Sequence, residues 1–189
     1  RSTSPNFQLV DNIAAGMQYL NDNTTKVALV AHTGTNIISS TLGTSASVSS
    51  DTVASVTPTF VLPGASISGG TAPGVPPVFS LGNITNGETN AGTMEYVVIE
   101  FNALVSNIAP NVDATPLTDT FQVKVSGANS GPASNSQSVT VAEPKINTLT
   151  KIVDKPTGDA GDPLVYTLTF TNTGSASAFD AVLTDTLDA

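Results

Sequence analysis

The clearest pattern in the sequence is a regular alternation of apolar and polar residues near its C-terminal end. Within residues 164–174, Leu164, Tyr166, Leu168 and Phe170 fall on one side of an extended chain, and mainly threonines fall on the other. A period of two residues is typical of a β-strand that buries one face. The segment therefore predicts a strand with one core face and one solvated face.

Several other segments show the same character. They end at Gly, Pro or Asn, which are turn-forming residues, and they comprise residues 94–105, 120–127, 136–143 and 150–155. Residues 21–32 have mild helical amphipathicity, but Thr24, Thr25, Val27 and Val30 favour a strand. Together these patterns predict an all-β protein.

The segment from residue 34 to residue 77 differs from its surroundings. It is rich in Ser, Thr and Gly, it ends in Pro-Gly-Val-Pro-Pro, and it contains short strand candidates at 46–48, 59–62 and 66–68. We interpret it as a decorated insertion in a β-domain.

Composition supports this fold class. The chain has 189 residues and 39% hydrophobic content, enough for one large or two small cores. Ser and Thr together make about a quarter of the chain, whereas charged residues make up 11% and aromatic residues 5%. Such a mixture favours strands and turns around thin sandwich cores.

Charge and cysteine content narrow the possible functions. The net charge is −9, and the few basic residues form no cluster that could neutralise a phosphate backbone, so nucleic acid binding is not expected. An acidic chain without cysteine is common among extracellular bacterial proteins, which predicts an extracellular or cell-surface location. No run of 18 apolar residues occurs, so we expect no membrane insertion in this segment and no signal peptide.

The end of the chain repeats its beginning. Residues 181–189 match residues 7–15, with Asp185 over Asp11 and Leu187 over Ile13, an offset of 174 residues. A short self-match at the two ends is what a segment of a longer periodic array would show. We expect both aspartates to end a strand and to bond local backbone amides.

A set of spaced motifs lies within residues 141–189. They are Lys-x-Val-Asp at 151–154, Ala-Gly-Asp at 160–162, Tyr-Thr at 166–167, Asn-Thr-Gly at 172–174 and Thr-Asp-Thr-Leu at 184–187. With these motifs the segment resembles the start of the DUF11/conserved-repeat domain, found in tandem in very large bacterial and archaeal cell-surface proteins. Residues 13–19 resemble the continuation of the last motif, with Ala14 and Asp188 where the family has proline, and residues 79–143 resemble the second half of such a domain.

The resemblance implies an immunoglobulin-like β-sandwich and a stalk, adhesin or surface-layer role without enzymatic activity. It also implies that the chain is cut out of register with the domain. Residues 1–143 would be a sandwich domain that lacks its opening strands, with 34–77 as an insertion, and residues 144–189 would be opening strands of the next repeat or complementing strands. An uncovered sandwich edge is a liability. The tail could fold back on its own domain, enter the next chain as a donor strand, or belong to a continuous array.

Candidate chemistry is sparse. His32 is the only histidine and cysteine is absent, so the sequence offers no convincing nucleophilic site, and we expect no enzyme. Calcium is the best metal candidate, since Asp154, Asp159 and Asp162 crowd one predicted turn, although a solvated turn explains the same residues.

A covalent Lys–Asn isopeptide bond is a further possibility, as some sandwich domains of pili use. Lys151 would supply the amine, and Glu95 or Glu100 would shuttle the proton. A lysine in a wet strand is the simpler interpretation of Lys151.

The sequence therefore predicts a structural repeat of a surface filament, stalk or surface layer, whose partners are copies of itself or neighbouring repeats. The alternative is an adhesin module that binds a glycan or another cell through residues 34–77.

Overall fold

The structure is a computed structural model that describes residues 2–90 and 92–187. It divides into two units. Unit 1 comprises residues 1–108 and 117–139, and unit 2 comprises residues 109–116 and 140–189. The sequence-based division lay at 143/144, whereas the observed one lies at 139/140. The loop 109–116 joins unit 2 because Asp113 accepts hydrogen bonds from the backbone amides of Glu143 and Ser175, at 3.2 and 3.1 Å.

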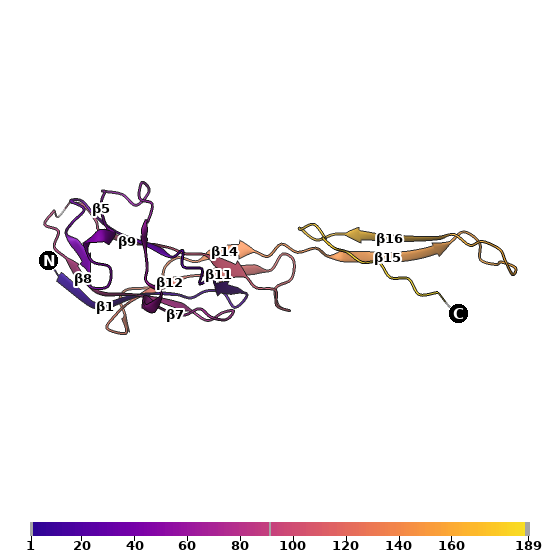
Figure 1. Ribbon diagram of the computed structural model, residues 1–189, viewed down its shortest axis with the longest axis horizontal. Helices are drawn as coiled ribbons and strands as arrows, with labels where there is room; N and C mark the ends of the chain where they lie inside the picture. The colour runs from indigo at the N-terminus through magenta and orange to yellow at the C-terminus, as the bar shows by residue number, and fades with distance from the viewer. Residues whose placement is uncertain (1, 91, 188–189) are drawn as a thin grey trace. The chain divides into compact units, whose positions relative to one another are not determined.

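The larger sheet of unit 1 is built around β1 and β8 (Figure 1). Its strands pair antiparallel in the order β13 (Ala128–Asn129), β12 (Phe121–Val125), β1 (Ser2–Asp11), β8 (Pro77–Asn86) and β4 (Ile37–Ser39), and β7 (Ile67–Gly69) also pairs with β8. The register of β1 on β8 shifts at Phe7, opposite Gly82. Gly82 has φ +67° and faces Ser40 too closely for a Cβ, so only glycine fits there.

The smaller sheet of unit 1 is centred on β3 (Lys26–Ala31). β3 pairs along its length with the antiparallel strand β9 (Tyr96–Glu100). The same β3 residues also pair with β6 (Phe60–Val61), antiparallel, and with β5 (Ser47–Ser49), parallel, so these two strands occupy the other edge of β3. Residues 26–31 thus form the strand that the threonines and valines favoured.

The core of unit 1 lies between these two sheets. Its buried side chains come mainly from β3 and β8, and they pack with Tyr19 of β2 (Met17–Tyr19), a strand paired with β10 (Ala103–Val105). Tyr19, Phe79 and Phe101 form an aromatic cluster with ring centroids 5.1–6.0 Å apart. The Tyr19 hydroxyl shares a 2.7 Å hydrogen bond with that of Thr25, so the buried phenol is satisfied.

Residues 34–77 take part in this core. They supply β4, β5, β6 and β7 and two short 3-10 turns, Thr44–Ala46 and Gly64–Ser66, and the three short strand predictions are confirmed. Ile37, Leu42 and Leu62 from this segment are buried among the core residues. The segment is therefore an integral part of unit 1 and not an appended decoration.

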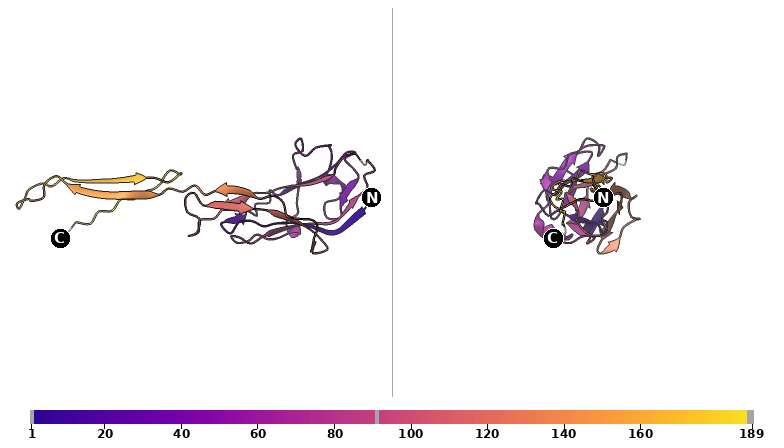
Figure 2. Two further views of the ribbon diagram at one scale, coloured as in Figure 1. Left: turned by 180° about the vertical axis from the view of Figure 1, so that it is seen from behind. Right: turned by 90° about the vertical axis from the view of Figure 1, so that its right-hand side faces the viewer.

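Unit 2 carries one long antiparallel hairpin, β15 (Ile146–Val153) and β16 (Tyr166–Asn172). Figure 2 shows the two strands side by side. A short ribbon of β11 (Pro116–Asp119) and β14 (Gln137–Thr140) precedes it along the chain. The strands predicted at 136–143, 150–155 and 164–174 are all present. The described chain is all-β with several antiparallel sheets, as expected, and it contains no helix long and apolar enough to cross a bilayer.

Removing the central aromatic ring should test this core. Phe79 is 1% exposed, so Phe79→Ala should lower the free energy of unfolding by about 3–5 kcal/mol through lost burial and a residual cavity. Phe179→Ala, at a side chain that is 85% exposed, should change it by less than about 0.5 kcal/mol. Urea unfolding followed by circular dichroism measures both, and equal losses would contradict the assigned core.

Candidate functional site

The main hollow of unit 1 lies beside strand β9. A cavity of about 440 Å³ is bounded by Val97, Ile99 and Phe101 on one side and by Leu9 and Phe121 on the other. A second cavity, of about 430 Å³, shares part of this lining and continues along β1 past Phe7. We call this continuous hollow the β9 groove; it also contacts Val53, Asp11 and Asp119.

The groove runs along an open edge of the smaller sheet. Within the residues that the structure describes, β9 pairs with β3 alone, so its outer edge has no strand beside it. The side chains that face the groove, Phe7, Leu9, Val97, Ile99 and Phe101, are only partly buried although they pack against the core. An apolar hollow beside an unpaired edge is suited to receive an added strand.

Two carboxyl groups sit at one end of the groove. Asp11 ends β1 and is only 6% exposed, and Asp119 ends β11. The backbone amide of Asn12 donates to the carbonyl oxygen of Thr120 at 2.7 Å and so ties the two strand ends together. Asp11 Oδ2 and Asp119 Oδ1 are buried without a hydrogen-bond partner among the described residues.

Burial controls the protonation of this pair. Loss of hydration, followed by a hydrogen bond to Asp119 and repulsion from its charge, raises the pKa of Asp11 from its ordinary 3.8 to about 7. Sequence reasoning expected Asp11 to end a strand, which is confirmed, but also to bond local amides, whereas its hydrogen-bond partner is the Asp119 carboxyl group. Asp119 was missed, because a lone acid after a strand looks like an ordinary turn residue.

The hairpin of unit 2 has an apolar face that stays largely exposed. Val153 pairs with Tyr166 and Lys151 with Leu168, so these side chains share one face, and Ile146, Leu149 and Phe170 continue it around a small hollow. No residue from 145 to 187 is buried. Leu149 is 69% exposed and Phe170 46%. The apolar face predicted for residues 164–174 is therefore present, but it is not buried in a core.

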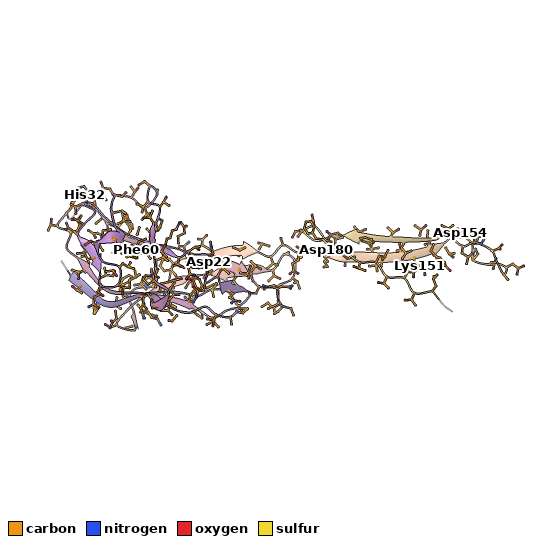
Figure 3. All side chains as sticks on the ribbon, in the orientation of Figure 1. Asp22, His32, Phe60, Lys151, Asp154 and Asp180 are labelled. Carbon is orange, nitrogen blue, oxygen red and sulfur yellow. The ribbon has the colours of Figure 1, made fainter. Side chains whose placement is uncertain are left out.

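Lys151 lies in the middle of this face (Figure 3). Its ammonium donates to Asp185 Oδ1 at 2.8 Å and sits 4.4 Å from the centre of the Tyr166 ring. Asp185 therefore bonds a side chain rather than the local amides that the sequence suggested, and it lies outside any strand, contrary to the prediction that it ends one. Glu95 and Glu100 lie in unit 1, before and at the end of β9. The isopeptide bond stays a prediction.

The calcium candidates do not gather. Asp154 accepts from the Val165 amide at 2.9 Å, Asp162 from the Asp159 amide at 3.1 Å, and Asp159 from the Ala160 amide at 2.8 Å. No group of three or more metal-ligating side chains occurs among the described residues. The arrangement is that of a solvated Asp/Gly turn, and calcium stays a prediction without geometric support.

His32 is held at the surface by Asp51. Its Nδ1 lies 2.6 Å from Asp51 Oδ1, and this hydrogen bond raises the pKa of the imidazole. The hydroxyl of Ser49 donates to the carbonyl oxygen of His32 at 2.6 Å rather than to the ring. The contacts of His32 are thus those of a residue that fastens a loop.

Comparison with known proteins gives no relative from which a function could be transferred. No protein-family model, no curated protein and no solved structure matches the chain. The resemblance to the conserved-repeat family stays a prediction.

The groove acids should make stability depend on pH. Between about pH 4 and about pH 7 the folded state keeps a proton on Asp11 that the unfolded chain releases, so the free energy of unfolding should fall as pH rises through this window. Asp11→Asn should remove a decline on the order of 1–3 kcal/mol. Urea unfolding of the dilute chain across this range measures it, and an equal decline in the variant would contradict the assignment.

Proposed function

We propose that this chain is a structural subunit of an extracellular filament, stalk or surface layer, and that copies join by completing each other's β-sandwich. The observation that carries the proposal is a pair of matching deficiencies. Unit 1 has an apolar groove along the unpaired edge of β9, and unit 2 has a hairpin whose apolar face is largely exposed. Each lacks what the other could supply.

Burial provides the driving force. Leu149, Phe170, Tyr166 and Ile146 are between 39% and 69% exposed, which is costly for side chains gathered on one face. Covering an exposed leucine or phenylalanine contributes about 1.5–3 kcal/mol. An added strand would also give the open edge of β9 its missing backbone hydrogen bonds.

The geometry of such an exchange favours a chain of subunits. The groove and the hairpin are different surfaces, so the contact is heterologous, and each subunit would offer one of each. Repeated head-to-tail, this contact extends a filament unless the rotation closes it into a ring. A covalent tandem array, with the same strands supplied by the neighbouring repeat, satisfies the same surfaces.

Further features support the extracellular and structural assignment. The resemblance to the conserved-repeat family favours an immunoglobulin-like sandwich at the cell surface. The chain is acidic and cysteine-free, and its one histidine fastens a loop, which supports a role other than catalysis. The adhesin alternative has less support, because residues 34–77 place Ile37, Leu42 and Leu62 in the core instead of forming a free binding loop.

Self-association should depend on the apolar face of β15. We expect the purified chain to form head-to-tail oligomers or fibres as its concentration rises. Leu149→Asp should weaken this association at least about 100-fold, because it places a charge in the buried contact. Thr150→Asp, on the solvated face of the same strand, should behave like the wild type.

Sedimentation velocity over a concentration series and negative-stain electron microscopy provide the readout. A wild-type chain that stays monomeric at every concentration would overturn strand exchange between separate chains. Equal effects of the two substitutions would show that the assembly uses another surface.

A further inference from the structure

The structure extends the internal repeat that links the two ends of the chain. At the offset of 174 residues, Asn6 corresponds to Asp180, and both have a left-handed backbone, with φ of 45° and 53°. Non-glycine residues rarely adopt this conformation. Leu9 then corresponds to Leu183 and Asp11 to Asp185. The tail 181–187 is therefore the counterpart of the second half of β1.

In unit 2 this tail lies along the apolar face of the hairpin. Leu183 shares a hollow with Ile146, Leu149 and Phe170, and Leu187 shares another with Lys151 and Tyr166. Asp185 completes the contact through its 2.8 Å ion pair with Lys151. The counterpart of β1 is thus already matched with a hairpin, and the counterpart of Asp11 with a lysine.

In unit 1 the same positions face the β9 groove. Phe7 and Leu9 line it where Ala181 and Leu183 face the hairpin, and Asp11 stands where Asp185 meets Lys151. The hairpin is missing, however, and Asp11 is buried with an oxygen that has no partner. Residues 181–185 thus have a hairpin and its lysine beside them, and residues 7–11 have neither.

We propose that the β9 groove is the seat of the β15–β16 hairpin of a second copy of this chain, and that Lys151 of that copy bonds to Asp11 and Asp119. The inference rests on the proposed function and adds to it the docking site and the residues that recognise the partner. On docking, Lys151 exchanges Asp185 of its own tail for Asp11 of its neighbour.

The chemistry of a lysine suits this seat. Two carboxyl groups in an apolar hollow need donors and positive charge, and an ammonium supplies three donors and one charge. The lysine stem can lie along the apolar wall while its end reaches the acids. Leu149 and Val153, two residues to either side, share the face of Lys151 and would fill the groove around it.

The exchange of partners is favourable on simple grounds. Lys151 and Asp185 are both about one-third exposed, and such a surface ion pair contributes little to stability. Asp11 is buried, so a lysine beside it relieves a larger cost. The tail 181–187 covers part of the hairpin in the free subunit, and β1 of a neighbouring subunit replaces it on assembly.

Two matched aspartate variants distinguish the contact of Asp11 in the groove from the contact of Asp185 in the tail. Asp11→Asn should weaken self-association of the full chain at least about tenfold. Asp185→Asn should leave association unchanged or strengthen it, because it weakens only the competing contact. Lys151→Met should weaken association as Asp11→Asn does. The double variant Asp11→Asn/Lys151→Met should associate no more weakly than either single variant, because both changes remove the same contact.

Carbodiimide cross-linking locates the contact directly. In an equal mixture of ¹⁵N-labelled and unlabelled chains, we expect Lys151 to couple to Asp11 or Asp119 in mixed-label peptide pairs. Circular dichroism should show that Asp11→Asn stays folded, since an uncharged amide of the same shape replaces a buried acid.

The outcomes distinguish this inference from the function on which it rests. If the wild type never associates, both are overturned. If it associates but the two aspartate variants behave alike and the mixed-label pairs are absent, the proposed seat is wrong and assembly by another route stands. If association requires an added divalent cation and is unchanged by Lys151→Met, Asp11 and Asp119 bind a metal ion instead. That result would also contradict the proposed docking site.

Discussion

The need of a β-sandwich to cover both inner faces of its sheets governs this molecule. In unit 1 the sheet of β3 ends at β9, and Phe7 and Leu9 on the opposite sheet stay only partly buried. In unit 2 a hairpin presents an inner face without any opposing sheet of its own. The partly buried apolar side chains and the open edge of β9 lie together in unit 1, and the proposed assembly would cover both.

Sequence periodicity predicted the elements that have a regular two-residue pattern. The strands β12, β14 and β16 fall within segments where apolar residues alternate with polar ones, β9 falls within a predicted segment that is a mainly apolar run, and β15 overlaps its predicted segment but begins four residues earlier, at Ile146. Only the end of β1 at Asp11 was predicted, because Ser2 to Asn6 are polar or proline and show no alternation. Pro77 and Gly82 interrupt the pattern of β8 in the same way.

The candidate site was harder to predict, because it depends on contacts between distant strands. Asp11 and Asp119 lie on strand ends that are joined by backbone hydrogen bonding across more than a hundred residues. Periodicity describes the faces of one strand and says nothing about which edge of a sheet stays unpaired. One sequence signal did relate to the groove. The self-match of the two ends aligned Asp185 with Asp11, and both residues belong to the proposed contact.

The buried carboxyl group of Asp11 also affects the tendency of the chain to aggregate. A free strand edge beside an apolar hollow attracts any extended hydrophobic segment, and such pairing begins many aggregates. A purely apolar strand that entered the β9 groove would seal an unpaired acid away from water, and that penalty opposes its entry. Under the proposed docking, the buried Asp11 carboxyl favours a strand that carries a cation at the matching position and opposes the entry of a purely apolar strand.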